Sequence, residues 1–227
     1  MNKSSLPVIA IDGPSASGKG TVAQLVAKSL GFHYLDSGAL YRIVALACQQ
    51  RNISWDDAQA VADCAKTLAI RFEGESVYLN DGDAARDISE EIRTENIGKG
   101  ASIVAVHPPL RAVLLGFQRD FLKAPGLVGD GRDMGTVIFP TAPLKIFLTA
   151  KTETRALRRT KQLTNKNQPA NYDAILQDLL ERDARDQNRA SAPLVMAEDA
   201  ILLETDHLDI PTAVDTILQQ FRHKIAK

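Results

Sequence analysis

A glycine-rich segment near the N-terminus constrains the fold more than any other feature of the sequence. Residues 13–21 read GPSASGKGT and match the pattern G-x-x-x-x-G-K. The segment follows a short apolar run and precedes apolar residues at helical spacing from residue 22 onward. A strand, a glycine-rich turn and a helix in this order are typical of a phosphate-binding loop, in which backbone N–H groups and the helix N-terminus face an anion. Lys19, which we expect to be exposed at the start of the helix, can then reach the β- and γ-phosphates of a nucleotide.

The loop differs from most loops of its kind at one position. Gly20 follows Lys19 where the usual Ser or Thr would contact Mg²⁺, and Thr21 comes one residue later. Contact with phosphate is therefore the firmer expectation, and Thr21 is a weaker candidate for contact with Mg²⁺, directly or through water. The predicted phosphate contacts are Gly13, Pro14, Ser15, Ala16, Ser17, Gly18, Lys19, Gly20 and Thr21.

Two other interpretations of this segment explain less. A glycine-rich turn without a ligand would leave Lys19 unexplained at a helix N-terminus, where a positive charge opposes the helix dipole. Residues 18–23 also match the dinucleotide-binding pattern G-x-G-x-x-A. However, Gly18 lies six residues beyond Asp12, and a loop of that length does not fit the dinucleotide pattern.

Short apolar runs alternate with helical patterns along most of the chain. Glycine at position 31 closes the first predicted helix, and a second strand and helix follow. This alternation predicts an α/β fold with a five-stranded parallel sheet and helices on both faces. The predicted strands are at residues 8–11, 33–35, 127–128, 146–148 and 201–203.

One segment, from about residue 66 to 102, interrupts this alternation. Apolar residues alternate at Ile70 and Phe72 and again at Val77 and Leu79, with a turn between the two pairs, which predicts a small hairpin. A chain of 227 residues is longer than one average domain and shorter than two. We therefore expect one domain with this segment as an inserted subdomain.

Composition and charge exclude several classes of protein. Lys and Arg number 27 and Asp and Glu number 28, so the chain offers no overall field that would hold nucleic acid or an anionic membrane surface. No uncharged apolar run approaches the roughly 20 residues of a membrane-spanning helix. Cys48 and Cys64 lack metal-binding spacing and are expected to be buried free thiols. We expect a cytoplasmic protein without nucleic-acid or membrane partners.

A basic segment in the second half of the chain is a further candidate anion site. Residues 151–167 contain six Lys or Arg and one Glu. Arg155 precedes Arg158 and Arg159 by three and four residues, so on a helix these arginines repel one another unless a ligand neutralises them. A solvated helix face is the alternative. The cluster as a whole, beside the Asn-rich residues 163–171, favours a polyphosphate clamp next to a mobile surface segment.

Two more groups of charged residues are candidates for ligand contact. Arg132 and Asp133 follow the third predicted strand, at the carboxyl end where open parallel sheets bind ligands, although Asp133 could also stabilise a turn. Residues 181–189 read ERDARDQNR, in which Arg182 and Asp186 share one helix face. This second group predicts either a salt-bridged helix surface or a ligand site.

The motifs of the chain, taken in order, resemble those of the bacterial cytidylate kinase family of nucleoside monophosphate kinases. The resemblance covers nearly the whole chain and implies a single P-loop kinase domain over residues 1–227. Within it, the resemblance implies an acceptor-binding subdomain at about 66–102 and a lid over ATP at about 155–171. The matching segments are VIAIDGPSASGKGT at 8–21, LDSGALYR at 35–42, EIRT at 91–94, GDGRDMGTVIFP at 129–140, KIFL at 145–148 and ERDARDQNR at 181–189.

The resemblance also implies roles for individual residues. Asp130 would help to hold hydrated Mg²⁺, Ser37 would cap a helix or face the substrate, and Arg158 would contact ATP from the lid. Arg111 is otherwise interpreted as a surface residue of a helix. Residues implied in catalysis are Lys19, Arg132, Arg158 and Arg189, and those implied in acceptor binding are Ser37, Arg42, Ser102, Arg111, Arg132, Asp133, Arg182, Asp186 and Arg189.

The function implied by the resemblance is transfer of the γ-phosphoryl group of ATP to CMP or dCMP. The products would be ADP and CDP or dCDP, with Mg²⁺ as cofactor, and the enzyme would act in pyrimidine nucleotide metabolism as a monomer. The alternative is a P-loop ATPase or nucleotide-dependent switch that acts on a protein partner. That alternative explains the loop but not the residues that resemble a second nucleotide site.

Overall fold

The chain divides into two compact units, which are described separately. The computed structural model describes residues 6–73, 76–81 and 84–225. The first unit comprises Met1–Asp36 and Gln118–Lys227, and the second comprises Ser37–Phe117. The predicted insert falls within the second unit and the predicted lid within the first. Their roles in acceptor binding and closure stay predictions.

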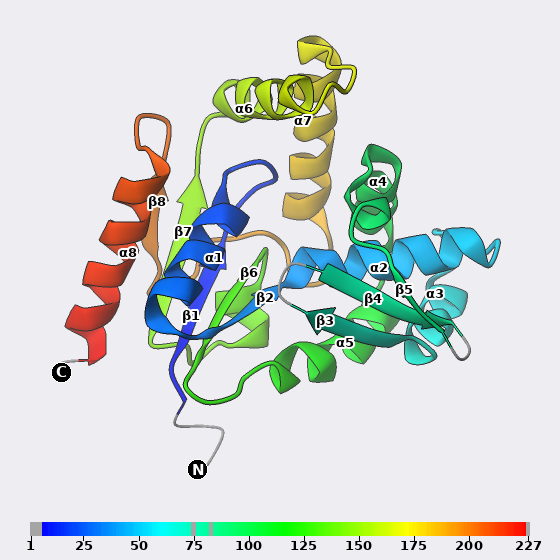
Figure 1. Cartoon of the computed structure of the whole chain (residues 1–227), viewed down its shortest axis with the longest axis horizontal. Helices are drawn as coiled ribbons and strands as arrows, with labels where there is room; N and C mark the ends of the chain where they lie inside the picture. The colour runs from blue at the N-terminus through cyan, green and yellow to red at the C-terminus, as the bar shows by residue number, and fades with distance from the viewer. Residues whose placement is uncertain (1–5, 74–75, 82–83, 226–227) are drawn as a thin grey trace. The chain divides into compact units, whose positions relative to one another are not determined.

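A five-stranded parallel sheet in the first unit confirms the fold class predicted from the sequence (Figure 1). Its strand order is β2-β6-β1-β7-β8. Every residue of β1 and β6 is buried, which explains why these strands are continuous apolar runs rather than alternating patterns. The strands are β1 (Val8–Asp12), β2 (His33–Asp36), β6 (Leu127–Gly131), β7 (Leu144–Thr149) and β8 (Ile201–Glu204).

The register of the sheet brings three aspartates to its carboxyl edge. Asp12, the last residue of β1, pairs with Gly131 of β6. Asp36, the last residue of β2, pairs with Asp130 of β6. The loop after β1 and the turn after β6 therefore begin side by side, at the edge where open parallel sheets bind ligands.

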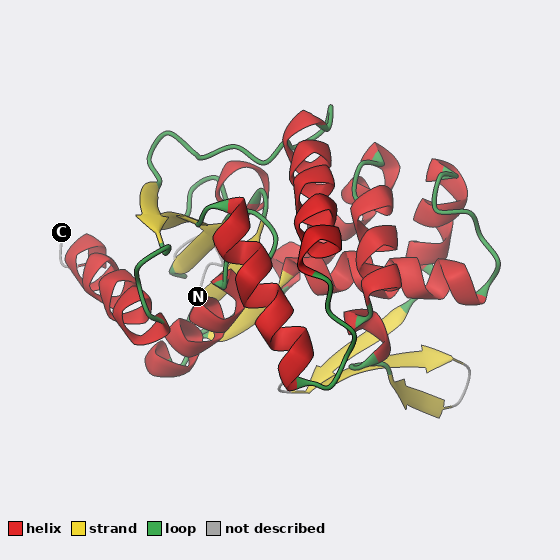
Figure 2. Ribbon diagram, turned by 90° about the horizontal axis from the view of Figure 1, so that it is seen from above, coloured by secondary structure: helices red, strands yellow, loops and turns green. Residues whose placement is uncertain are grey.

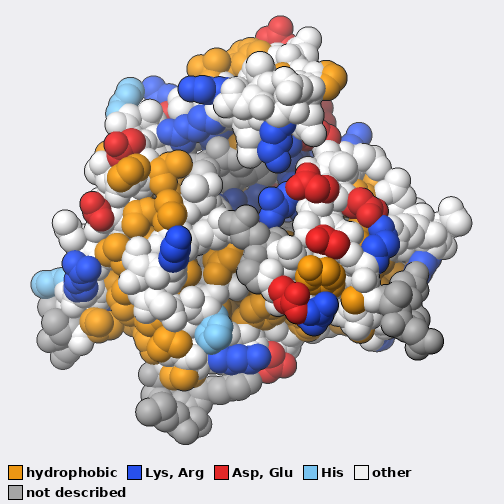
Figure 3. All heavy atoms as spheres, in the orientation of Figure 1, with side chains coloured by type: hydrophobic (Ala, Val, Ile, Leu, Met, Phe, Trp, Pro, Cys, Tyr) orange, Lys and Arg blue, Asp and Glu red, His pale blue; other side chains and the backbone are white. Residues whose placement is uncertain are grey.

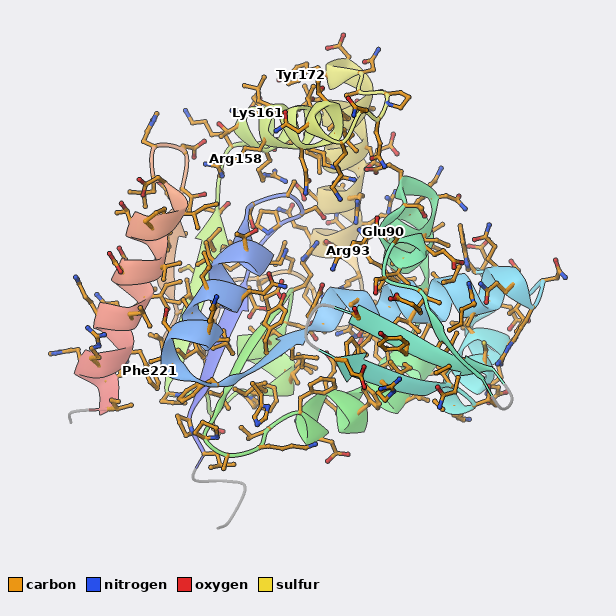
Figure 4. All side chains as sticks on the ribbon, viewed as in Figure 1. Glu90, Arg93, Arg158, Lys161, Tyr172 and Phe221 are labelled. Carbon is orange, nitrogen blue, oxygen red and sulfur yellow. The ribbon has the colours of Figure 1, made fainter. Side chains whose placement is uncertain are left out.

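Two helices of the first unit share an apolar core with this sheet. Residues of α1 and α8 pack with β1, β6 and β7 in one buried cluster. The rings of Phe32 and Phe221 meet edge to face with centroids 5.6 Å apart, and Phe221 is labelled on α8 in Figure 4. Gly31 ends α1 in the left-handed conformation, as the sequence predicts. The bounds are α1 (Lys19–Leu30) and α8 (Ile210–Ile225).

Helices α6 (Thr152–Asn165) and α7 (Tyr172–Asn188) also belong to the first unit, and α6 lies across the end of α7 (Figure 1). The polar segment predicted at 163–171 is shorter in the structure, because α6 continues to Asn165. Leu163 is buried and fixes the last turn of α6 despite its polar neighbours. A short π-helix, η3 (Met134–Ile138), follows β6 and completes the carboxyl edge.

The second unit contains helices with a small antiparallel sheet (Figure 2). Helix α2 packs against α4, and a Cβ atom at Gly100 of α4 would lie 2.5 Å from the ring of Trp55. Cys48 and Cys64 are buried free thiols, as predicted. The helices are α2 (Ser37–Gln50), α3 (Ala58–Lys66), α4 (Glu95–Val104), α5 (Pro108–Asp120) and the short η2 (Glu91–Arg93).

The hairpin predicted inside the insert is present, and a third strand extends it. Strands β3 (Ala69–Glu73) and β4 (Ser76–Asp81) pair antiparallel, with Phe72 opposite Val77. The additional strand, β5 (Ala84–Asp87), pairs with β4. Its sequence, AARD, has no apolar alternation, so the periodicity argument did not find it.

Among the described residues, no single helix is both long and apolar enough to cross a membrane. Only the sharply bent pair of α4 and α5 meets those criteria of length and composition, and only when the two are taken together.

Candidate functional site

The phosphate-binding loop has the strand, turn and helix context predicted for it. The loop leaves β1 at Asp12 and enters α1 at Lys19. A Cβ atom at Gly13 would lie 2.0 Å from the carbonyl oxygen of Leu148 on β7, so only glycine fits there. Gly18 at the N-cap of α1 has φ 89°, and Ala16 has φ 57°, which is unusual for a residue with a side chain. Glycine therefore suits the loop at residues 13 and 18, whereas Ala16 adopts a conformation that its side chain does not favour.

Lys19 is buried, so the expectation of an exposed side chain at the helix start is wrong. Only 8% of Lys19 is exposed, and its Nζ donates to the Pro14 carbonyl at 3.2 Å. Burial, and then the nearby charge of Arg132, lower the pKa of Lys19 to about 8. The loop folds over the ammonium group, which therefore lies inside the turn, where a polyphosphate would supply further negative charge.

Asp130 lies next to the position where this loop departs from the usual pattern. A Cβ atom at Gly20 would be 3.9 Å from Asp130 Oδ2. The Tyr34 hydroxyl donates to Asp130 Oδ1 at 2.6 Å, a contact that the sequence did not predict. Burial, and then the charge of Asp36, raise the pKa of Asp130 to about 7. An oxygen ligand thus stands beside residue 20, where most such loops have a hydroxyl group, and a bound cation would favour its charged form.

Arg132 and Asp186 form an ion pair at the carboxyl edge of the sheet. Arg132 Nε donates to Asp186 Oδ2 at 2.7 Å, and Arg132 Nη2 donates to Ser15 Oγ in the loop at 2.8 Å. Burial by itself raises the pKa of Asp186, but the charges of Arg132, Arg189 and Arg182 outweigh burial and hold it below its usual value. The structure thus links a predicted acceptor ligand directly to the phosphate-binding loop.

The other predicted acceptor residues of the first unit lie near this pair. Arg189 Nη2 is 3.7 Å from Asp133 Oδ1, and both side chains are buried. Arg182 is 3.8 Å from Asp178, one turn before it on α7. The salt-bridged helix surface considered from the sequence is therefore present in part, but Asp186 reaches beyond its own helix to Arg132.

The basic cluster of α6 contains one buried arginine, Arg155, and two partly exposed ones, Arg158 and Arg159. Lys and Arg side chains gather over α6 in Figure 3, and Figure 4 labels Arg158 and Lys161 on this helix. Arg158 donates to Thr205 Oγ1 at 3.0 Å and to the Ser17 carbonyl at 3.5 Å. Arg155 is buried and donates to Asp183 at 2.6 Å. The expected repulsion within the cluster is therefore relieved by a carboxylate of the protein, and Arg155 is not available to clamp a polyphosphate.

In the second unit the structure places four further predicted acceptor residues on helices. Arg42 on α2 donates to the carbonyls of Ile92 at 2.9 Å and Thr94 at 3.4 Å. Arg111 donates to the Ala105 carbonyl at 3.2 Å, and its guanidinium carbon lies 5.7 Å from the centre of the Tyr41 ring. Only 8% of Arg111 is exposed, so its interpretation as a surface residue is wrong. The remaining two, Ser37 on α2 and Ser102 on α4, are buried.

Asp12 is a buried residue of the site that the motif analysis did not single out. Its two carboxylate oxygens accept from the backbone N–H groups of Met134 at 2.7 Å and Gly135 at 2.8 Å. These contacts hold the turn that follows Arg132 and Asp133. In the sequence, Asp12 is a lone acidic residue at the end of an otherwise apolar strand. Burial of such a carboxyl group costs free energy unless its oxygens accept hydrogen bonds.

We expect Asp12 to make the folded protein less stable as pH rises from about 4 to 6. Burial, the largest influence, raises the pKa of Asp12 from 3.8 to about 6, although both backbone contacts lower it. In this window the folded state keeps a proton that the unfolded state has released, so stability falls as pH rises, by on the order of 3 kcal/mol. Asp12→Asn should remove this contribution, which urea unfolding of both proteins between pH 4 and 7 would measure.

Asp199→Asn is the matched control for this pH dependence. The hydrogen bond from Lys145 lowers the pKa of Asp199, so its contribution to stability has the opposite dependence on pH. A difference in unfolding free energy between the wild type and Asp12→Asn that does not change with pH would contradict the assignment.

Two other features of the described residues concern a pocket in the second unit and the binding of metal ions. A pocket of about 410 Å³ in the second unit is lined by Ser76, Asp87, Ser89, Glu90, Glu91 and Arg93, of which Glu90 and Arg93 are labelled in Figure 4. Within the described ranges, no cluster of three or more His, Cys, Asp or Glu is arranged to hold a metal ion.

Comparison with known proteins agrees with the features of both units. The family description "Cytidylate kinase" matches residues 9–223. A cytidylate kinase of Chromobacterium violaceum is 56% identical over 221 residues, which are 97% of this chain and 98% of the relative. One of Nitrosomonas europaea is 52% identical over 221 residues, 97% of each chain. A solved structure of an uncharacterized protein from Eubacterium ventriosum, 14% identical, matches 95% of this chain and 98% of its own with a TM-score of 0.50, which supports the fold alone.

Proposed function

Since this chain belongs to the cytidylate kinase family, we propose that it uses the site described above to transfer the γ-phosphoryl group of ATP to CMP or dCMP. It is a nucleoside monophosphate kinase, and its products are ADP and CDP or dCDP. The observation that carries the proposal in the structure is the buried Lys19 inside the loop, with Arg132 donating to Ser15 of that loop. A P-loop ATPase or switch is not favoured, because the family match spans both units.

The donor and acceptor phosphates would meet at the carboxyl edge of the sheet. The loop residues Gly13–Thr21 and Lys19 would hold the phosphates of ATP, and Arg158 would contact them from α6. Arg132 and Arg189 would hold the acceptor phosphate, together with Arg42 from the second unit. Phosphoryl transfer of this kind needs alignment and positive charge more than a general base. We therefore assign no base to the reaction.

The remaining contacts concern the sugar and the base of the acceptor. The carboxylate of Asp186 and the guanidinium of Arg182 would form hydrogen bonds with hydroxyl groups of the pentose. Asp133 would accept from the exocyclic amino group of cytosine, and Arg111 and Ser102 of the second unit would assist. Ser37 would face the substrate from the start of α2. In this proposal the insert at about 66–102 belongs to the acceptor site and the segment at about 155–171 closes over ATP.

The residues of the loop fit a magnesium ion bound mainly through phosphate and water. Asp130 supplies a carboxylate oxygen beside Gly20, and Thr21 supplies a hydroxyl group in the first turn of α1. Mg²⁺ bound there would neutralise charge on the β- and γ-phosphates. We also propose that the enzyme acts as a monomer in the cytoplasm, in pyrimidine nucleotide metabolism.

Coupled measurement of ADP formation tests the proposed reaction. With ATP, the enzyme should form ADP rapidly when CMP or dCMP is present, and very slowly when neither is added. UMP and AMP serve as competing acceptors in the same assay. Equal ADP formation with and without CMP would contradict the proposal and favour an ATPase.

We expect Asp133→Asn to lower phosphorylation of CMP much more than that of UMP. A carboxylate accepts from the amino group of cytosine, whereas uracil offers a carbonyl oxygen at that position. Asp133 is buried beside Arg189, so its orientation is fixed. We expect kcat/KM for CMP to fall about 10- to 100-fold and that for UMP to change less than about threefold. Equal losses with both acceptors would place Asp133 in a structural role.

A further inference from the structure

Two arginines donate to Ser15 of the phosphate-binding loop, and each of them forms an ion pair with an aspartate of α7. Arg155 Nη1 donates to the Ser15 carbonyl at 2.9 Å, and Arg132 Nη2 donates to its hydroxyl at 2.8 Å. Arg155 is paired with Asp183 at 2.6 Å and Arg132 with Asp186 at 2.7 Å. The two aspartates are three residues apart on α7 and therefore lie on one face of the helix.

The two arginines differ in how much of their hydrogen-bonding capacity is used within the protein. Arg155 is 3% exposed and uses four of its five N–H groups: Nε donates to the Ala150 carbonyl, Nη1 to Ser15, and Nη2 to both Thr152 and Asp183. A buried guanidinium group with four of its five N–H groups in hydrogen bonds has only one N–H group left for a nucleotide phosphate. Its contribution must act through the protein groups that it holds.

By donating to the Ser15 carbonyl, Arg155 fixes the direction of the loop amide between Ser15 and Ala16. A trans peptide is planar, so its carbonyl and its N–H point in opposite directions. Fixing the Ser15 carbonyl toward Arg155 therefore turns the N–H of Ala16 away from Arg155. Ala16 has φ 57°, a left-handed conformation that is unfavourable for a residue with a side chain. Such a conformation persists only where surrounding contacts hold it.

We propose that Arg155 and Asp183 are positioning residues for phosphoryl transfer, which hold the peptide between Ser15 and Ala16 so that the Ala16 N–H faces the donor phosphates. Asp183 supplies the counter-charge that keeps the Arg155 guanidinium in place, and α7 thereby fixes the donor loop. The inference rests on the proposed function, because it concerns how that kinase binds ATP. Neither residue contacts the nucleotide.

Conservative variants test the proposal in the full-length protein. Arg155→Lys keeps a positive charge near Asp183 but cannot reach four acceptors from one nitrogen. Asp183→Asn keeps the shape of the side chain and removes the counter-charge. We expect both to lower kcat/KM for ATP about 10- to 100-fold, with KM for CMP within about threefold of the wild type. The control, Asp199→Asn, removes a more exposed ion pair with Lys145 in the same unit and should leave both constants unchanged.

The amide resonance of Ala16 gives a readout that does not depend on turnover. In ¹H–¹⁵N spectra, the Ala16 resonance of the free protein should shift in both variants and not in Asp199→Asn, and its change on addition of ADP should be reduced. An unaltered Ala16 resonance, or equal rises in KM for ATP and CMP, would overturn the proposal. A wild type that binds ADP but fails to phosphorylate CMP would contradict the proposed function instead, and the Ala16 resonance would still test the role of Arg155.

Discussion

Lys19→Met is expected to reduce phosphoryl transfer by about 10³-fold or more. The ammonium group lies inside the loop, where its Nζ already contacts the Pro14 carbonyl, so it needs little rearrangement to meet a polyphosphate. Charge that is fixed in advance in a site with little water stabilises the transferring group more strongly than charge that must first be oriented. Steady-state kinetics with ATP and CMP would measure the loss. Methionine keeps approximately the volume of the buried stem and removes the charge together with the hydrogen bond to Pro14.

Because Lys19 is buried, its replacement is also expected to change stability. Its pKa is lowered mainly by burial, so the charged group destabilises the free protein, and an apolar side chain of similar volume should stabilise it slightly. Lys145→Met is the matched control, since Lys145 is another buried lysine of the first unit and pairs with Asp199. Retention of more than about a tenth of wild-type activity by Lys19→Met, at normal stability, would show that the loop does not bind the donor through this residue.

The parallel sheet and the position of the loop could be predicted because both depend on local patterns. Apolar runs, the glycine-rich turn and the change to helical spacing are properties of neighbouring residues, and the five strands formed where these patterns placed them. Strand β5 could not be found in this way. Its residues are held by pairing with β4 rather than by burial of alternate side chains.

In the site, too, features set by neighbouring residues could be predicted, whereas those set by residues distant in the sequence could not. The loop sequence predicted a lysine near phosphate, but its burial depends on a turn that folds back over it. The spacing of the arginines of α6 did not show which of them is buried, and the position of Asp183 on α7 distinguishes Arg155 as a buried, paired residue. Arg111 likewise became buried through contacts with Tyr41 and Ala105, which no spacing rule connects to it. Charged side chains with several acceptors in different elements were thus the least predictable part.

Arg132→Met is expected to have the second large effect, and on the acceptor rather than the donor. Arg132 connects Ser15 of the loop with Asp186, so it lies between the predicted positions of the two nucleotides. An arginine can bind an acceptor phosphate through two N–H groups at once. In the free protein Arg132 donates to the hydroxyl of Ser15 and the carboxylate of Asp186, and it can exchange these partners for a phosphate. We expect kcat/KM for CMP to fall about 10²- to 10³-fold, with the affinity for ATP within about threefold of the wild type.

The variant Arg132→Lys separates charge from geometry at the same position. Lysine keeps the positive charge beside Asp186 but loses the planar fork, so we expect it to recover only part of the lost activity. Arg119→Met is a suitable control, because Arg119 donates to the carbonyls of Ile138 and Val137 and has no assigned contact with either nucleotide. If Arg132→Met weakened ATP as much as CMP, the hydrogen bond to Ser15 would be the important contact, and Arg132 would belong to the donor loop. An effect confined to CMP would instead mean that Asp186 and Ser15 hold Arg132 ready for the acceptor phosphate.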